Sequence, residues 1–227
     1  MTSYTQDLTV GYAQRRGGDY LSPVADDLLL CGRWPHLRSL ALTNLWSSPQ
    51  TGLDVTSSFL AAHANLQVLH LDLSVGTGLQ AGQLTLPPDS LPRLRELRSN
   101  RDFASAVLHC PSSIPGGRPL EIIKGVKLSG TGWDEKFLAG LKMSGGNMKR
   151  IELAGWNEAE DVKRLVSCVP KLVWLDVGKR SNVQTTTAAS GPSNLVSDTS
   201  SIIHLLRRLT DIGVRLNGYL SYPRSLS

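Results

Sequence analysis

The sequence has little of what several protein classes require. Its three cysteines, Cys31, Cys110 and Cys168, are odd in number and form no C-x-x-C pair, so neither a disulfide framework nor a thiolate metal site is indicated. Aromatic residues make up 6% of the 227 positions and charged residues 19%, with a net charge of only +5. No apolar run approaches the roughly 20 residues that cross a bilayer, so we expect no membrane span.

The N-terminal segment and the number of cysteines indicate the cellular compartment. The segment Met1–Tyr12 has neither a basic start nor a hydrophobic stretch, so we expect no secretory signal peptide. An odd number of unpaired cysteines favours a reducing, intracellular location, cytoplasmic or nuclear. A free cysteine packs as a small hydrophobic residue, and we therefore expect the three thiols to be buried.

Basic residues are more numerous than acidic ones but are not concentrated. The 24 Lys and Arg against 19 Asp and Glu give a pI near 9.3, which implies a mild attraction to acidic surfaces. The densest groups are pairs such as Lys149-Arg150 and Lys179-Arg180. Because no longer run of basic residues occurs, we expect no nucleic-acid partner.

Leucine is abundant, with 37 residues or about 16% of the chain, and it recurs in a pattern. The segments 37–42, 66–71 and 172–177 all follow L-x-x-L-x-L with conservative exchanges, and weaker copies start at 94, 123, 148 and 209. The spacings between successive starts are 29, 28, 29, 25, 24 and 37 residues, and five of the six lie in the range of a leucine-rich repeat. An earlier copy is indicated at Leu8-Thr9-Val10.

This spacing has a direct structural meaning. In an extended segment the side chains alternate between two faces, so the fourth and sixth residues of the pattern point one way and the third, fifth and seventh the other. One unit cannot cover its own leucines, so neighbouring units must stack their strands into a parallel sheet. The fold class we expect is α/β, a solenoid or horseshoe with a parallel sheet on the concave face and helices on the convex face.

Helical stretches lie between these strands. The candidates, from apolar spacing and helix-start residues, are 22–30, 59–64, 103–108, 134–141, 159–168 and 198–208. We therefore expect residues 1–227 to form a single irregular domain of about seven or eight repeats. The segment 181–200 is rich in Ser, Thr, Ala and Gly and is expected to be a flexible insertion.

The lines Trp34-Pro35-His36-Leu37-Arg38-Ser39-Leu40-Ala41-Leu42 and Cys168-Val169-Pro170-Lys171-Leu172-Val173-Trp174-Leu175 carry a family resemblance. They resemble leucine-rich-repeat proteins of the ribonuclease-inhibitor-like superfamily, most closely the repeat half of fungal-type F-box proteins. The resemblance covers roughly residues 8–217. It implies a substrate-recognition role in an F-box-type ubiquitin ligase, with an SCF-type ligase as partner if a longer form carries an F-box.

The sequence departs from that family at its start. An F-box is a helical segment that opens with Leu-Pro ahead of the repeats, and none precedes Leu37. The pairs Leu86-Pro87 and Leu91-Pro92 fall between repeats and are expected in loops. Two alternatives therefore stay open: a leucine-rich-repeat regulator of a small GTPase, acting through a rim residue such as Arg101 or Lys179, and a truncated fragment without independent function.

Enzymatic chemistry is not indicated. The five histidines show no H-E-x-x-H spacing, no serine lies in G-x-S-x-G, and Gly116-Gly117 and Gly145-Gly146 lack a following Lys-Ser/Thr. The carboxylates Glu158, Glu160 and Asp161 lie at an expected helix start, where they favour the helix dipole. We expect a non-catalytic protein without cofactor or metal.

The expected site is the concave sheet face, which would bind a protein partner. Its side chains mix both signs of charge, which gives directional polar contacts. The candidate binding residues are Trp174, Arg150, Glu152, Asp176, His70, Asp72, Arg98, Lys127 and Arg215. Trp174 beside Arg150 and Asp176 has the composition of an interface hot spot. The pattern assigns Lys127 to the fifth position of the repeat at 123, and Arg215 to the seventh position of the repeat at 209.

Overall fold

The computed structural model describes residues 5–11, 24–48, 52–75, 84–115, 117–130, 132–180 and 215–217. These residues form strands, five α-helices and a 3-10 helix, and a helix separates most of the strands. The strands are β1 (Asp7–Gly11), β2 (Ser39–Ser47), β3 (Val68–Val75), β4 (Glu96–Ser99), β5 (Ile122–Lys127), β6 (Arg150–Trp156), β7 (Trp174–Asp176), β8 (Lys179–Arg180) and β9 (Arg215–Asn217). The helices are α1 (Asp26–Cys31), α2 (Gly52–Ala62), α3 (Arg101–His109), α4 (Glu135–Ser144) and α5 (Ala159–Cys168), and η2 (Gly145–Asn147) is the 3-10 helix.

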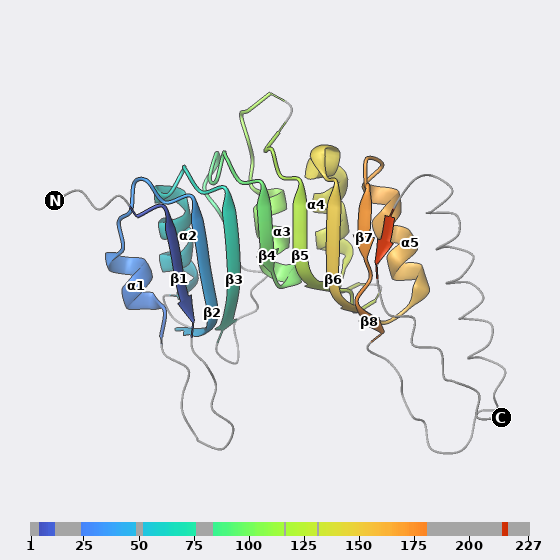
Figure 1. Ribbon diagram of the computed structural model, residues 1–227, viewed down its shortest axis with the longest axis horizontal. Coiled ribbons are helices and arrows are strands. Elements are labelled where there is room, and N and C mark those ends of the chain that lie inside the picture. Colours follow the sequence, from blue (N-terminus) through green and yellow to red (C-terminus); the bar gives the residue numbers. More distant parts are fainter. Residues whose placement is uncertain are drawn as a thin grey trace, which may run out of the picture.

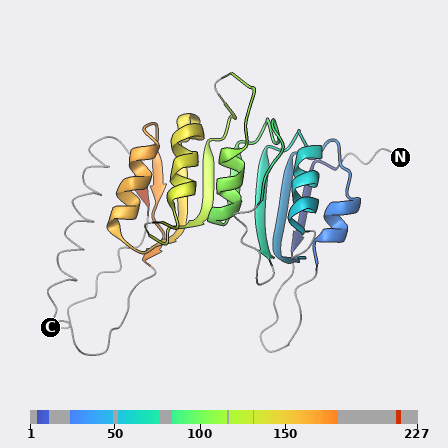
Figure 2. The same ribbon diagram turned by 180° about the vertical axis from the view of Figure 1, so that it is seen from behind.

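The protein has an α/β architecture with a parallel sheet. The strands follow one another in chain order, β1-β2-β3-β4-β5-β6-β7-β9, with β8 paired to β6, and every pairing is parallel (Figure 1). Seen from behind, the helices all lie against one face of the sheet (Figure 2). In the described part of the chain no helix combines the length and hydropathy needed to cross a membrane.

One row of aliphatic side chains runs along the sheet. The fourth residues of the repeats are register partners from strand to strand: Leu8, Leu40, Leu69, Leu97, Ile123, Ile151, Leu175 and Leu216. Those from Leu40 to Leu175 are at most 1% exposed. Each leucine is therefore covered by the leucines of the units on either side, together with the helices behind.

The backbone hydrogen bonds recur from unit to unit, as the buried side chains do. Five times, the N–H of a first-position residue (Leu37, Leu66, Leu94, Met148 and Leu172) donates to the carbonyl three residues earlier, which closes a turn ahead of the strand. The carbonyls of the second-position residues Arg38, Gln67, Arg95, Glu121 and Lys149 each accept two N–H groups from the following unit. The Arg38 carbonyl, for example, accepts from Gln67 at 2.7 Å and from Val68 at 3.0 Å.

The expected register of one strand is wrong. The pattern places a repeat start at Ile123, but Ile123 pairs with Leu97 and therefore occupies the fourth position, so the repeat starts at Leu120. Ile122 and Lys124 then take the third and fifth positions, and Lys127 lies further along, beyond an irregularity at Gly125, whose φ is +83°. The alternation of buried and exposed residues in β5 is hard to recognise in the sequence, because Ile122 and Ile123 are both apolar and Gly125 adds one residue. Corrected starts at 37, 66, 94, 120, 148 and 172 are 29, 28, 26, 28 and 24 residues apart.

The last expected repeat is also displaced. Arg215 pairs with Trp174, which puts Arg215 at the third position rather than the seventh. The start at Leu209 is therefore wrong by four residues. The expected insertion 181–200 and the expected helix 198–208 lie outside the described residues.

The other expected helices are confirmed, each overlapping a helix from α1 to α5, although α1 begins only at Asp26. The expectation for the thiols is correct for one cysteine only. Cys110 is buried, whereas Cys168 is half-buried and Cys31 is exposed. Cys31 and Cys168 are the last residues of α1 and α5, where the chain leaves the helix.

Replacing Leu69 by Ala tests the aliphatic row. Leu69 is fully buried between Leu40 and Leu97, so we expect the free energy of unfolding, measured by urea denaturation, to fall by about 2–5 kcal/mol. The matched control is Val68→Ala on the same strand, because Val68 is 36% exposed and points to the opposite face. Its expected effect is about 0.5 kcal/mol. Equal losses for the two variants would contradict the alternation.

Candidate functional site

The third, fifth and seventh positions share the face of the sheet that no described helix covers, which we call the open face (Figures 1 and 2). Its third-position row, in strand order, is Asp7, Ser39, Val68, Glu96, Ile122, Arg150, Trp174 and Arg215. Its fifth-position row is Thr9, Ala41, His70, Arg98, Lys124, Glu152 and Asp176. The structure thus brings eight of the nine expected site residues onto one surface, with Asp72 as an exposed side chain further along β3. Lys127 is also exposed, but its register partner is Gly155, so the pairing does not place it in these rows.

An aromatic cluster occupies one end of the open face. The guanidinium carbon of Arg150 lies 5.1 Å from the ring centroid of Trp174, and the same guanidinium pairs with Glu152 at 2.5 Å. Asp176 follows Trp174 on the same side of β7, and Arg215 is the register partner of Trp174 on β9. These five residues, which we call the Trp174 cluster, combine one aromatic ring with two basic and two acidic side chains.

Three polar atoms of the Trp174 cluster are buried without a hydrogen bond to the described residues: the indole Nε1 of Trp174, the guanidinium Nε of Arg150 and Oε1 of Glu152. Only the Glu152 oxygen is compensated, by its ion pair with Arg150. A buried donor without an acceptor costs about 1–3 kcal/mol. The folded chain therefore carries an unfavourable term here that an additional acceptor would relieve.

The middle of the open face, on β3, β4 and β5, carries charged side chains and one histidine. Lys124 and Glu96 form an ion pair at 2.7 Å between neighbouring strands. Arg98 lies between His70 and Lys124 in the fifth-position row and is exposed. Partial burial, and then the nearby positive charge of Arg98, lower the pKa of His70 below its ordinary value. His70 is therefore a neutral hydrogen-bonding group on this surface at physiological pH.

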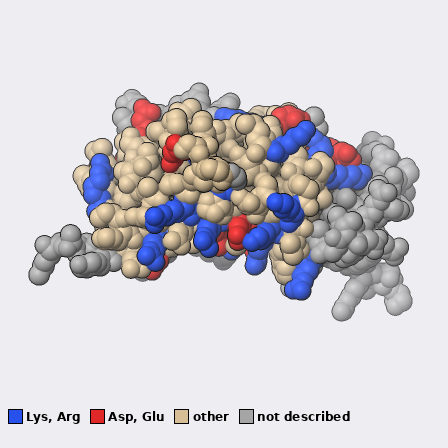
Figure 3. Space-filling model, turned by 90° about the horizontal axis from the view of Figure 1, so that it is seen from above, with Lys and Arg blue, Asp and Glu red and all other residues tan. Residues whose placement is uncertain are grey.

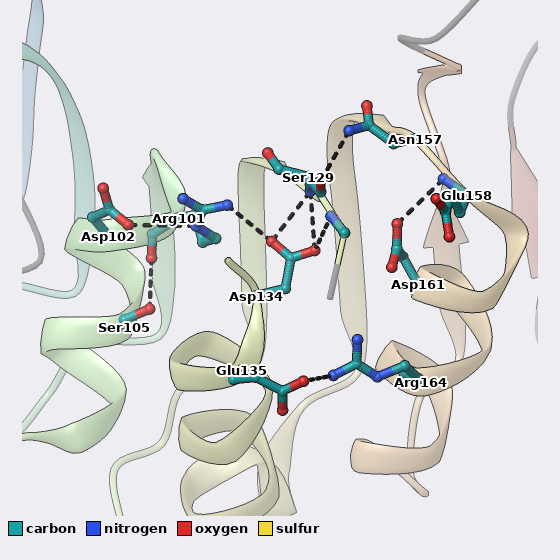
Figure 4. Close-up of polar contacts among 11 residues, drawn as sticks. Arg101, Asp102, Ser105, Ser129, Asp134, Glu135, Asn157, Glu158, Asp161 and Arg164 are labelled. Atoms are coloured by element: carbon teal, nitrogen blue, oxygen red, sulfur yellow. Dashed lines mark hydrogen bonds and ion pairs between the residues drawn. The ribbon is translucent and has the colours of Figure 1, made fainter. Parts of the chain in front are cut away.

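The C-terminal ends of the strands β5 and β6 carry a polar network with a structural role (Figure 4). Asp134, at 0% exposure, accepts from the backbone N–H groups of Ser129 at 2.9 Å and Gly130 at 3.0 Å. Its carboxylate also pairs with Arg101 at 2.9 Å. Asn157 from the next unit donates to the Ser129 carbonyl at 3.0 Å. These contacts hold the turn after β5 against the starts of α3 and α4.

The expected helix-start carboxylates belong to a similar arrangement. Asp161 is buried and accepts from the Glu158 N–H at 3.2 Å (Figure 4). Burial raises the pKa of Asp161, while the hydrogen bond from the Glu158 N–H opposes this rise. Glu160 pairs with Lys163 at 3.0 Å on the helix surface. Asp161 and Glu160 thus each have a partner in the framework.

His63 has a defined structural environment. Its Nδ1 lies 2.7 Å from the Phe59 carbonyl, and its Nε2 accepts from the Trp34 N–H at 3.1 Å. Because an N–H donates to Nε2, the proton of the neutral ring is on Nδ1. The ring also stacks on Phe59 at 4.0 Å between centroids. In the described residues no group of three or more His, Cys, Asp or Glu could hold a metal ion.

Two features of the surface escaped the sequence analysis. Lys124 was missed because the register of β5 was wrong. Trp133 was missed because it lies outside the repeat pattern, in the turn after β5. At 67% exposure Trp133 is the most exposed described aromatic side chain, and its ring lies 6.0 Å from the guanidinium carbon of Arg101. A glycine-rich turn followed by Trp is the only signal of it in the sequence.

Comparison of the chain with protein-family models, curated proteins and solved structures finds no match.

The environment of His63 predicts a dependence of stability on pH. Burial is the main cause that lowers the pKa of His63, so between the folded pKa and about 6.5 the unfolded chain binds more protons. The free energy of unfolding should therefore fall as the pH is lowered from 7 towards that folded pKa. Urea denaturation at a series of pH values measures this effect.

The comparison is made in a His70→Gln background, which removes the other histidine with a lowered pKa. In that background His63→Gln should lower stability at pH 7, and it should also flatten the pH dependence. An unchanged slope between pH 7 and 5 would show that His63 does not titrate in this way.

Proposed function

We propose that the chain is a leucine-rich-repeat solenoid that acts as a non-catalytic protein-interaction module and binds a partner protein on its open face. The continuous aliphatic row and the repeated turn ahead of five strands support the repeat architecture. Stacked repeats bury one face of each strand and leave the other available along the whole sheet.

The observation that carries this proposal is the Trp174 cluster. Tryptophan and arginine dominate the binding energy of protein interfaces, most of all where they are packed together. Here the Arg150 guanidinium lies over the Trp174 ring at 5.1 Å. Glu152 pairs with Arg150, and Asp176 follows on the same side of the sheet. The Arg150 side chain remains 43% exposed, so its outer guanidinium N–H groups can donate to a partner's carbonyl or carboxylate.

The resemblance to F-box proteins makes a substrate receptor of a ubiquitin ligase the most specific form of this proposal. In that form the open face holds the substrate protein. The GTPase-regulator alternative needs a free arginine at a rim. Arg101 does not meet this need, because its side chain is only 16% exposed and pairs with buried Asp134. Lys179 is exposed but lacks the forked geometry of arginine.

The double variant Trp174→Ala/Arg150→Ala tests the cluster. The tagged protein is used to capture partners from cell extract, and quantitative mass spectrometry compares the proteins retained by each variant. We expect a specific partner to be lost, because removal of a hot-spot residue costs about 2 kcal/mol or more, which is roughly a 30-fold loss of affinity. The melting temperature should change little.

The matched control is Glu160→Ala/Lys163→Ala, which removes an exposed ion pair on α5, on the helix side of the sheet. It should retain the same partner as the unmodified chain. If the Trp174 variant retains every protein that the control retains, the open face near Trp174 is not the binding site.

A further inference from the structure

A second surface lies at the edge of the sheet where the strands begin. Because all strand pairings are parallel, the residues that precede the strands share this edge, which we call the N-terminal edge. Seen from above, Lys and Arg side chains gather over it (Figure 3). Seven exposed basic residues lie before the strands or at the nearby helix ends: Arg33, Arg38, Arg93, Arg95, Lys142, Lys149 and Lys171.

Two acidic residues on the same edge, exposed Asp89 and half-buried Glu121, are already engaged. Asp89 accepts from the N–H and the hydroxyl of Ser113, at 2.6 and 2.9 Å, and these bonds lower its pKa. Glu121 pairs with Lys149 at 2.8 Å, which lowers its pKa in turn. By contrast, Arg38, Arg95 and Lys171 form no side-chain hydrogen bond or ion pair with the described residues. The edge therefore has an uncompensated positive charge.

The fold does not require these basic residues. At the opposite edge, each of the five helices has an acidic residue in its first turn, where the helix dipole favours it. The same effect would favour basic residues in the last turns, which lie towards the N-terminal edge. Only α3 and α4 have one there, His109 and Lys142, and the remaining helices have none. Most basic residues of the edge lie instead in the turns and strand starts beyond the helices.

Three of these side chains form a straight row. Arg38, Arg95 and Lys149 occupy the second position in alternate repeats, and the backbone ladder that links second-position carbonyls to the next unit joins them. Neighbouring strands lie about 4.8 Å apart, so the row is about 19 Å long. An extended peptide covers that distance with about six residues, at roughly 3.3 Å per residue.

We infer that the N-terminal edge binds an acidic peptide segment of a partner protein, about six to eight residues long, laid across the strands. The carboxylates of such a segment meet Arg38 and Arg95 in turn, and the row ends at Lys149, which pairs with Glu121 of the unit between. Single-stranded nucleic acid fits less well, because its bases stack on exposed aromatic rings. Among the described residues the edge offers no such ring, since Trp34 packs against Phe59 and His63, and exposed Trp133 lies at the opposite edge.

Titration with a fluorescein-labelled octaglutamate peptide, followed by fluorescence anisotropy at about 50 mM salt, tests this inference. The test variant is Arg38→Glu/Arg95→Glu. We expect it to bind the peptide about tenfold more weakly or worse than the unmodified chain, because each reversal replaces an attraction by a repulsion. Binding to the unmodified chain should weaken as salt is raised to about 200 mM.

The matched control is Lys163→Glu/Lys179→Glu, which changes the net charge equally on α5 and β8, away from the edge. Thermal melting monitored by circular dichroism verifies that both variants fold. Equal weakening in the two variants would show attraction by net charge alone and would overturn the inference. So would absence of peptide binding, or binding of oligo-dT or phosphatidylserine vesicles in preference to the peptide. The Trp174→Ala/Arg150→Ala variant should bind octaglutamate normally, so this test and that of the open face can fail separately.

Discussion

The whole structure depends on the burial of one aliphatic side chain per strand between its counterparts in the neighbouring units. No unit can cover its own leucine, and each therefore requires the next one in register. The row from Leu40 to Leu175 satisfies this requirement without a gap, including the two positions where isoleucine replaces leucine. Since the row and the other inward residues occupy every second position of a strand, the residues between them are free to vary. The open face and the N-terminal edge are products of that freedom.

Most of the architecture could be predicted because it follows from a period in the sequence. The alternation within L-x-x-L-x-L identified the strands, the buried side and the surface that carries Trp174 and Arg150. The prediction failed where local geometry interrupts the alternation. Adjacent Ile122 and Ile123 both fit a buried position, and the left-handed Gly125 adds a residue that a fixed template does not contain. The ion pair of Arg101 with Asp134 joins residues 33 positions apart, and only the stacking of two units reveals it.

The charges of the molecule are separated along the strands. Acidic residues gather where helices begin, because buried turns and helix dipoles require acceptors there, as Asp134 and Asp161 illustrate. Basic residues gather at the N-terminal edge, where the Arg38 and Arg95 side chains form no hydrogen bond or ion pair with the described residues. The open face lies between the two, with charges of both signs around Trp174. The chain thus has two separate surfaces, the open face with Trp174 and charges of both signs, and the cationic N-terminal edge.

The most direct test of the stacked arrangement is the set of nuclear Overhauser contacts between backbone amides in solution. The account predicts contacts that pair Leu69 with Leu97, Leu97 with Ile123, and Ile123 with Ile151, all in parallel register. Contacts between Leu97 and Val126, or between strands out of chain order, would contradict it.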